Sequence, residues 1–112
     1  MRINPSEVNG TITSTGVSNA IGPYKFRPPT MKGVDVQAVS TNSTDVVEAI
    51  AVPPGMDQTD ANNYIVAITS NTCPTSFTVA GDYNELKSPC DIYVYATTCT
   101  GTITVKIIVN KL

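Results

Sequence analysis

Three cysteines are the residues of this chain best suited to chemistry, because a thiolate can act as a nucleophile, bind a metal or join a disulfide. Two of them, Cys73 and Cys99, each follow a threonine in stretches that read nearly alike, "NTCPTSFTV" and "TTCTGTITV". The odd number of cysteines and the lack of an apolar N-terminal secretion signal favour a reducing compartment. We therefore predict free thiols at Cys73, Cys90 and Cys99, with a Cys73–Cys99 disulfide as the alternative. Zinc is not expected, since the chain has no histidine and no C-x-x-C pair.

A calcium site is the next chemistry to consider, in the polar loop "GMDQTDANN" at 55–63. Asp57, Asp60, Asn62 and Asn63 supply oxygen ligands of the kind that calcium prefers. Their spacing does not match that of an EF-hand loop, and acidic polar loops are common. We predict no metal site and no cofactor.

Two tyrosines could form a ligand platform. Tyr93 and Tyr95 are two residues apart in a stretch that is typical of a strand, so they share one face. Paired aromatic rings on a sheet can stack against sugar rings or bases, or pack against neighbouring strands and subunits. The chain has no tryptophan and no basic groove, so packing is favoured and no nucleic-acid partner is expected.

Catalysis has little support in the sequence. Without histidine the usual general base is absent, no Ser-x-x-Lys pair occurs, and no glycine-rich phosphate loop follows a strand. We predict that the protein is not an enzyme and has no catalytic residues.

The composition predicts the elements that must position these residues. The chain has 112 residues, enough for one domain with its own core. Charged residues make up 14% of it, against about 25% in an average protein. Thr, Val and Ile dominate, and branching at Cβ suits a pleated strand better than a helix. The expected class is therefore all-β.

The first strands are expected at 34–39 and 44–52, separated by the turn-forming residues "STNS". Alternation places Val34, Val36 and Ala38 on one face of the first strand. The second strand would return beside it, until Pro53 and the residues after it stop the pairing.

Two β-hairpins are predicted after residue 63, and each repeated cysteine phrase would mark one turn. Residues 64–69 would pair with 76–80, and residues 91–96 with 102–110. Alternation then buries Phe77 and Val79 in the first return strand. In the second it buries the four branched residues Ile103, Val105, Ile107 and Val109.

The first 33 residues look different from the rest. They carry a net charge of +3 against −5 for the remainder, and glycine and proline interrupt their second half. A small hairpin could form at Asn9-Gly10, but proline at this density favours extended chain. We therefore predict two parts, an extended arm at 1–33 and a domain at 34–112. The domain would be a small antiparallel β-sandwich or barrel-like meander.

By this general organisation the chain resembles the small decoration, or cement, proteins of tailed bacteriophages and related virus capsids. The resemblance rests on short length, Thr- and Val-rich strands, an N-terminal arm and the lack of an active-site motif. It implies a non-enzymatic structural protein of the virion that bridges shell subunits and stabilises the capsid. Implied partners are the major capsid protein or another shell subunit, and further copies of the chain in a homo-oligomer such as a trimer. The implied location is the capsid surface, after assembly in the host cytoplasm, with no membrane partner.

In this interpretation the arm binds the shell. Its apolar anchors would be Tyr24, Phe26 and Met31, and its positioning charges Arg2, Lys25, Arg27 and Lys32. Two alternatives stay open. One is a β-sandwich binding module that holds a glycan or receptor through Tyr93 and Tyr95. The other is a subunit of a tail or surface filament, in which the arm adds a strand to its neighbour.

Overall fold

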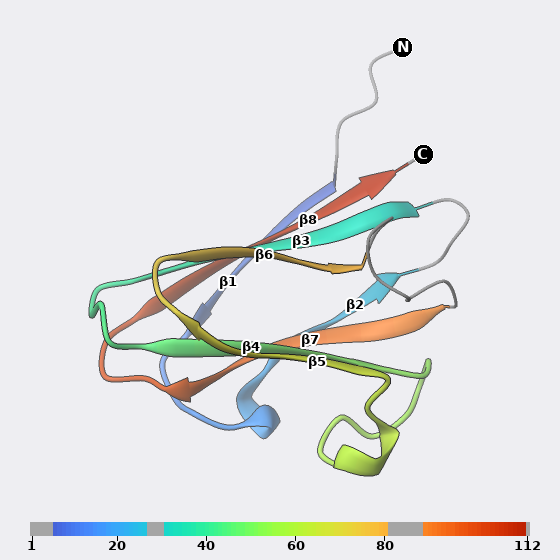
Figure 1. Ribbon diagram of the computed structural model, residues 1–112, viewed down its shortest axis with the longest axis horizontal. Coiled ribbons are helices and arrows are strands. Elements are labelled where there is room, and N and C mark those ends of the chain that lie inside the picture. Colours follow the sequence, from blue (N-terminus) through green and yellow to red (C-terminus); the bar gives the residue numbers. More distant parts are fainter. Residues whose placement is uncertain (1–5, 27–30, 81–88, 112) are drawn as a thin grey trace.

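The computed structural model describes residues 6–26, 31–80 and 89–111, and these form eight strands and two short 3-10 helices (Figure 1). The expected all-β class is confirmed. The strands are β1 (Ser6–Ile12), β2 (Ile21–Phe26), β3 (Met31–Ser40), β4 (Val46–Val52), β5 (Val66–Thr72), β6 (Thr75–Ala80), β7 (Cys90–Thr98) and β8 (Ile103–Lys111). The 3-10 helices are η1 (Val17–Asn19) and η2 (Ala61–Asn63). Within these described ranges, no helix has the length and apolar character that a membrane span requires.

Two four-stranded antiparallel sheets pack face to face as a sandwich (Figure 1). The first sheet has the strand order β1-β8-β3-β6 and the second the order β2-β7-β4-β5. Successive strands therefore change sheet at every connection except the one between β4 and β5. Eight strands in this order form a jelly roll.

The predicted hairpins are wrong in their pairing, although their strands exist. β5 and β6 belong to different sheets, and so do β7 and β8, and β3 and β4. Alternation identifies which residues face inward but not which strand lies beside them. Two strands joined by a short turn bury the same residues whether they pair within one sheet or face each other across a sandwich. The hairpin expected at Asn9-Gly10 is also wrong, because both residues lie inside β1.

The prediction of a separate arm is wrong for the described residues 6–26. β1 pairs with β8 from Ser6↔Val109 to Ile12↔Ile103, and β2 pairs with β7. Pro23 is accommodated within β2 because it lies where the register of this edge strand shifts. A proline at such a position removes no needed backbone donor. Residues 1–5 and 27–30 of the proposed arm lie outside the described residues.

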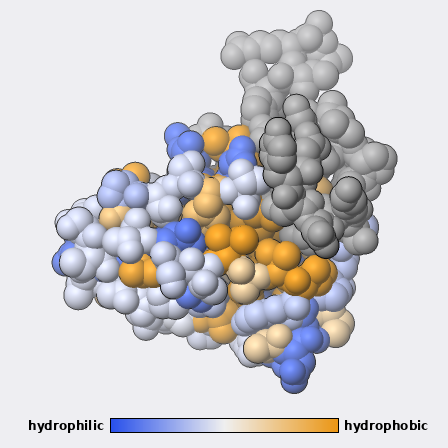
Figure 2. All heavy atoms as spheres, in the orientation of Figure 1, coloured by the Kyte–Doolittle hydropathy of each residue, from blue (hydrophilic) through white to orange (hydrophobic). Residues whose placement is uncertain are grey.

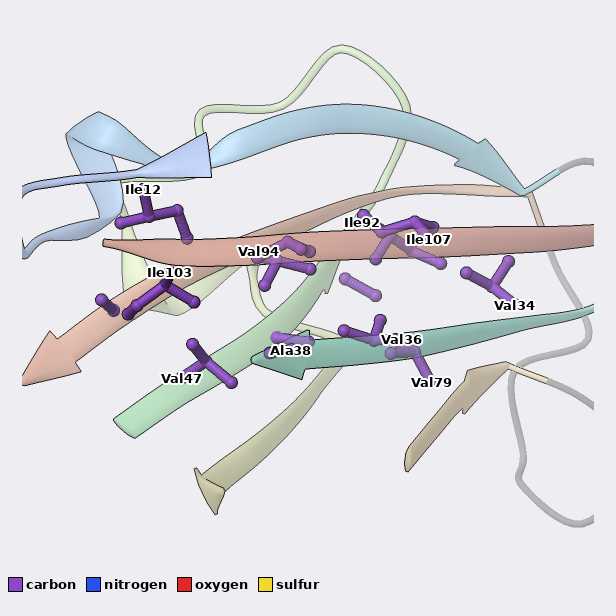
Figure 3. Packing of buried hydrophobic residues seen from close by; sticks show 14 of the residues in the cluster. Ile12, Val34, Val36, Ala38, Val47, Val79, Ile92, Val94, Ile103 and Ile107 are labelled. Carbon is purple, nitrogen blue, oxygen red and sulfur yellow. The ribbon is translucent and has the colours of Figure 1, made fainter. Parts of the chain in front are cut away.

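The core lies between the two sheets, where branched side chains from six strands meet (Figure 3). The predicted inward residues of β3, namely Val34, Val36 and Ala38, are fully buried. Ile103, Val105 and Ile107 of β8 and Val79 of β6 are fully buried too, whereas Phe77 is half-buried. The side chain of Val109 lies outside those described. Small and branched residues thus fill the interior without any large aromatic cluster.

The outer face of the second sheet is also covered. Ile50, Val52 and Tyr93 are buried there, on the opposite side of β4 and β7 from the main core. They pack with residues of the β1–β2 connection, such as Val17, and of the β4–β5 connection, such as Tyr64. Both faces of β4 are therefore buried from Ala49 to Val52, which explains the unbroken apolar run "AIAV" there.

Candidate functional site

A buried carboxylate joins three connections at one end of the sandwich. Asp45, just before β4, has no exposed surface. Its Oδ1 accepts hydrogen bonds from the amide and the hydroxyl of Thr100, both at 2.7 Å. Its Oδ2 accepts from the Ser40 hydroxyl at 2.6 Å and from the Gly101 amide at 3.0 Å. The backbone oxygen of Asp45 accepts from the Cys73 amide at 2.8 Å.

We call these five residues the corner junction: Ser40, Asp45, Cys73, Thr100 and Gly101. Ser40 ends β3, and the other four lie in the β3–β4, β5–β6 and β7–β8 connections, all of which pass from one sheet to the other. Four donated hydrogen bonds, of which the one from Ser40 has the largest effect, hold the pKa of Asp45 well below its usual range despite burial. The carboxylate is thus ionised at neutral pH and has its acceptor positions filled. It organises three turns and is poorly suited to act as a base.

Gly101 has a steric role in the junction. A Cβ added there would collide with the Thr41 hydroxyl and lie 3.0 Å from the Asn42 amide nitrogen. Thr41 in turn accepts a hydrogen bond from the Thr102 amide, so the two turns lie against each other. The glycine of "TTCTG" therefore permits close approach of the β3–β4 turn.

The repeated cysteine phrase marks two corners of this junction. Cys73 and Cys99 lie at the same end of the sandwich, as predicted, and Cys90 begins β7 at the opposite end. No disulfide joins Cys73 and Cys99. The Cys99 Sγ lies 3.2 Å from the Gly101 oxygen. Burial, and then the charge of Asp45, raise the pKa of both thiols, so both are poor nucleophiles at neutral pH.

The two candidate tyrosines share a face, as predicted, but that face is not an open platform. Tyr93 is only 8% exposed, beneath the connections that cover the second sheet. The half-buried Tyr95 donates its hydroxyl to Glu48 Oε1 at 2.6 Å. Burial, and then this bond to the carboxylate, strongly raise the pKa of Tyr95. These rings serve packing rather than ligand stacking.

The acidic loop uses its oxygens within itself. Asp57 Oδ1 accepts from the amide and hydroxyl of Thr59, at 2.9 and 2.7 Å. Asp60 caps η2 by accepting from the Asn62 amide at 3.0 Å. The Asn63 side chain donates to the Asp57 backbone oxygen at 3.0 Å. Across 6–26, 31–80 and 89–111, no group of three His, Cys, Asp or Glu side chains is placed to hold a metal.

Of the seven residues expected to anchor a shell, only Tyr24, Lys25 and Phe26 have described side chains, and these three do not share one exposed surface. Phe26 is 3% exposed and belongs to the core of its own domain, so its prediction as an anchor is wrong. Tyr24 is half-buried against the same core, and burial raises its pKa. Lys25 is exposed and lies opposite Asp91 in the register of β2 and β7. The other four candidates are not placed: Arg2 and Arg27 lie outside the described residues, as do the side chains of Met31 and Lys32.

A feature that residue-by-residue reasoning missed is the neutral edge, which we define as β5 and β6. Each is one of the two edge strands of its sheet, and the other edges are β1 and β2. From residue 61 to residue 81 the chain has no Asp, Glu, Lys or Arg. A scan for runs without charge could have found it, although only the fold places both strands at sheet edges.

Comparison with known proteins adds no family to this description. The chain matches no protein-family model, and no curated protein matches it.

Proposed function

We propose that this chain is a non-enzymatic structural protein of a virion, which binds the capsid surface and stabilises the shell by bridging its subunits. The observation that carries the proposal is the jelly-roll strand order. Jelly rolls of two Greek keys recur in viral capsid and lectin domains, so the support is an analogy of fold. The expected partners are the major capsid protein or another shell subunit, together with further copies of this chain.

Residues 6–26 would not act as a separate arm, because β1 and β2 are part of the sandwich. The outer face of the first sheet is the better surface, since the corresponding face of the second sheet is covered by connections. The exposed residues that define it are Asn9, Thr11, Gln37, Val39, Ser76, Thr78 and Thr104, and the half-buried Asp35 and Lys106 lie among them. Hydroxyl, amide and two charged groups around one exposed apolar side chain suit a wet, moderate contact that many symmetric copies would strengthen through avidity.

Val39 provides the sharpest test, because it is the most exposed large apolar residue described, at 59%. The experiment compares wild type, Val39→Glu and Ile65→Glu for incorporation into virions purified from cells that produce the protein. Ile65 is a matched control, 47% exposed and located at the end of the β4–β5 connection, directly before β5. We expect Val39→Glu to lower the number of copies per particle at least tenfold, or about 1.4 kcal/mol per site, and Ile65→Glu to leave it unchanged.

Particles without the protein should also break at lower temperature than complete particles. If wild type never copurifies with particles, the proposed function is wrong. If both variants bind as well as wild type, the function stands and the docking face is wrong.

The alternative of a glycan or receptor module based on Tyr93 and Tyr95 loses its main support. One ring is buried, and the hydroxyl of the other is bound to Glu48.

A further inference from the structure

The neutral edge differs from the other sheet edges in how it is protected. Edge strands present unpaired backbone groups, and proteins usually guard them with charge, proline or bulges. On the opposite side of the sandwich, β1 contains Glu7, and β2 contains Lys25 and Pro23 beside a register shift. Neither β5 nor β6 contains a charged residue or a proline.

Of the two neutral strands, β6 is the more regular. β5 is interrupted where its register with β4 shifts, and Ser70 there has a positive φ of 61°. In β6, the four residues from Thr75 to Thr78 pair without interruption with β3, and the one shift lies beyond Thr78. A regular, uncharged run of this kind is a template for a further strand.

The interior beside this edge is apolar. Val66 and Ile68 of β5 and Phe77 of β6 are partly buried and pack against the core. β5 and β6 run along the same side of the sandwich, joined by a short connection (Figure 1). Figure 2, in the same orientation, shows hydrophobic atoms in the middle of this side. A strand added here would therefore also cover apolar surface.

We propose that β6 pairs with β6 of a second copy of this chain, antiparallel and about a two-fold axis. An uncharged strand offers nothing to attract a charged partner and nothing to repel its own copy. Antiparallel pairing of identical strands is self-complementary, because the backbone groups that one copy leaves open are those the other requires. The proposed function expects contact with further copies of this chain without naming a surface; the inference assigns that contact to β6, and its test uses the isolated protein.

Ser76 is the position at which to test the pairing. Its side chain is exposed on the outer face of the first sheet, opposite Gln37, so a charge there need not disturb the core. The variants are Ser76→Lys and Ser76→Glu, with Thr11→Lys as the control. Thr11 is an exposed residue on the same face, on β1 at the opposite edge of that sheet. Circular dichroism and urea denaturation would verify that each variant folds.

Sedimentation velocity of the isolated protein, from micromolar to millimolar concentration, measures the association. We expect wild type and Thr11→Lys to dimerise equally and each Ser76 variant to associate at least tenfold more weakly. An equimolar mixture of Ser76→Lys and Ser76→Glu should dimerise again, because opposite charges then meet across the two-fold axis. Loss of pairing by misfolding would not be rescued by mixing.

The inference is overturned if wild type stays monomeric, if the Ser76 variants dimerise as well as wild type, or if Thr11→Lys is weakened equally. It is also overturned if the mixture stays monomeric. These outcomes are distinct from those for the proposed function: a monomer that still enters particles overturns only the β6 pairing. A dimer that never enters them overturns only the virion role.

Discussion

Truncating Val105 to alanine tests the inward face of β8, the strand at the centre of the first sheet's core. Val105 is fully buried and lies in register with Gly10 on β1 and Ala38 on β3. Neither neighbour has a side chain long enough to fill the space left by two methyl groups. The cavity should therefore persist.

The magnitude follows from two contributions. Two buried methyl groups contribute about 1.6 kcal/mol at about 0.8 kcal/mol each. A residual cavity of about 40 Å³ adds roughly 1 kcal/mol at about 24 cal/mol per Å³. We expect Val105→Ala to lower the free energy of unfolding by about 2–3 kcal/mol. With a urea m-value of about 2 kcal/mol/M, the midpoint falls by a little over ~1 M.

Thr104→Ala is the matched control on the opposite face of the same strand. Thr104 is exposed and faces Thr11 and Val39, so the change removes only cross-strand contacts. We expect a cost of a few tenths to about 1 kcal/mol. Both variants would be measured by urea denaturation of the isolated protein. If Thr104→Ala is the more damaging, the two faces of β8 have been exchanged and the assigned register is wrong.

Three further outcomes are expected. Phe26→Ala should destabilise the fold by about 3–5 kcal/mol in urea denaturation, since Phe26 lies in the core; an unchanged midpoint would mean that β2 is a dispensable arm. Thiol titration in denaturant without reductant should count three thiols per chain, whereas a count of one would indicate a Cys73–Cys99 disulfide. Because folding lowers the Asp45 pKa, its stabilising contribution is complete above the unfolded value of about 3.9 and is lost as the pH falls through the lower folded value. Urea midpoints should therefore fall more between pH 7 and pH 3 for wild type than for Asp45→Asn, and we expect this variant to be less stable than wild type at pH 7. Equal falls would exclude this role for Asp45.

The fold class could be predicted because it depends on local pattern. β-Branched composition and two-residue alternation identified the strands around Val36 and Val105 and their buried sides correctly. The pairing could not be predicted in the same way. β8 pairs with β1, about 100 residues earlier in the chain, and with β3. Short connections suggested hairpins, and nothing local distinguishes a hairpin turn from a corner that changes sheet.

The candidate site, too, could be predicted only in the features that depend on local sequence. The repeated phrase correctly placed Cys73 and Cys99 at one end of the molecule. Each of these cysteines directly follows a strand of similar length, β5 or β7. Asp45 was not recognised, because "STNSTD" has the composition of an ordinary polar turn. Two of its donor residues, Thr100 and Gly101, are more than fifty residues away in the chain, so only the folded structure brings them to it.

The strand order also explains why a buried carboxylate belongs at this corner. When successive strands change sheet, the backbone amides of the connecting turns leave one hydrogen-bonded ladder before they enter the next. A carboxylate can accept several such amides at once, as Asp45 does for Thr100 and Gly101. Its own backbone oxygen accepts the Cys73 amide, so the third corner is held by the same residue. One ionised side chain thus satisfies groups from two corners and fixes the spacing of the sheets at this end. At β6 the edge-facing backbone groups instead lie in a row along the sheet, where water or a further strand can satisfy them.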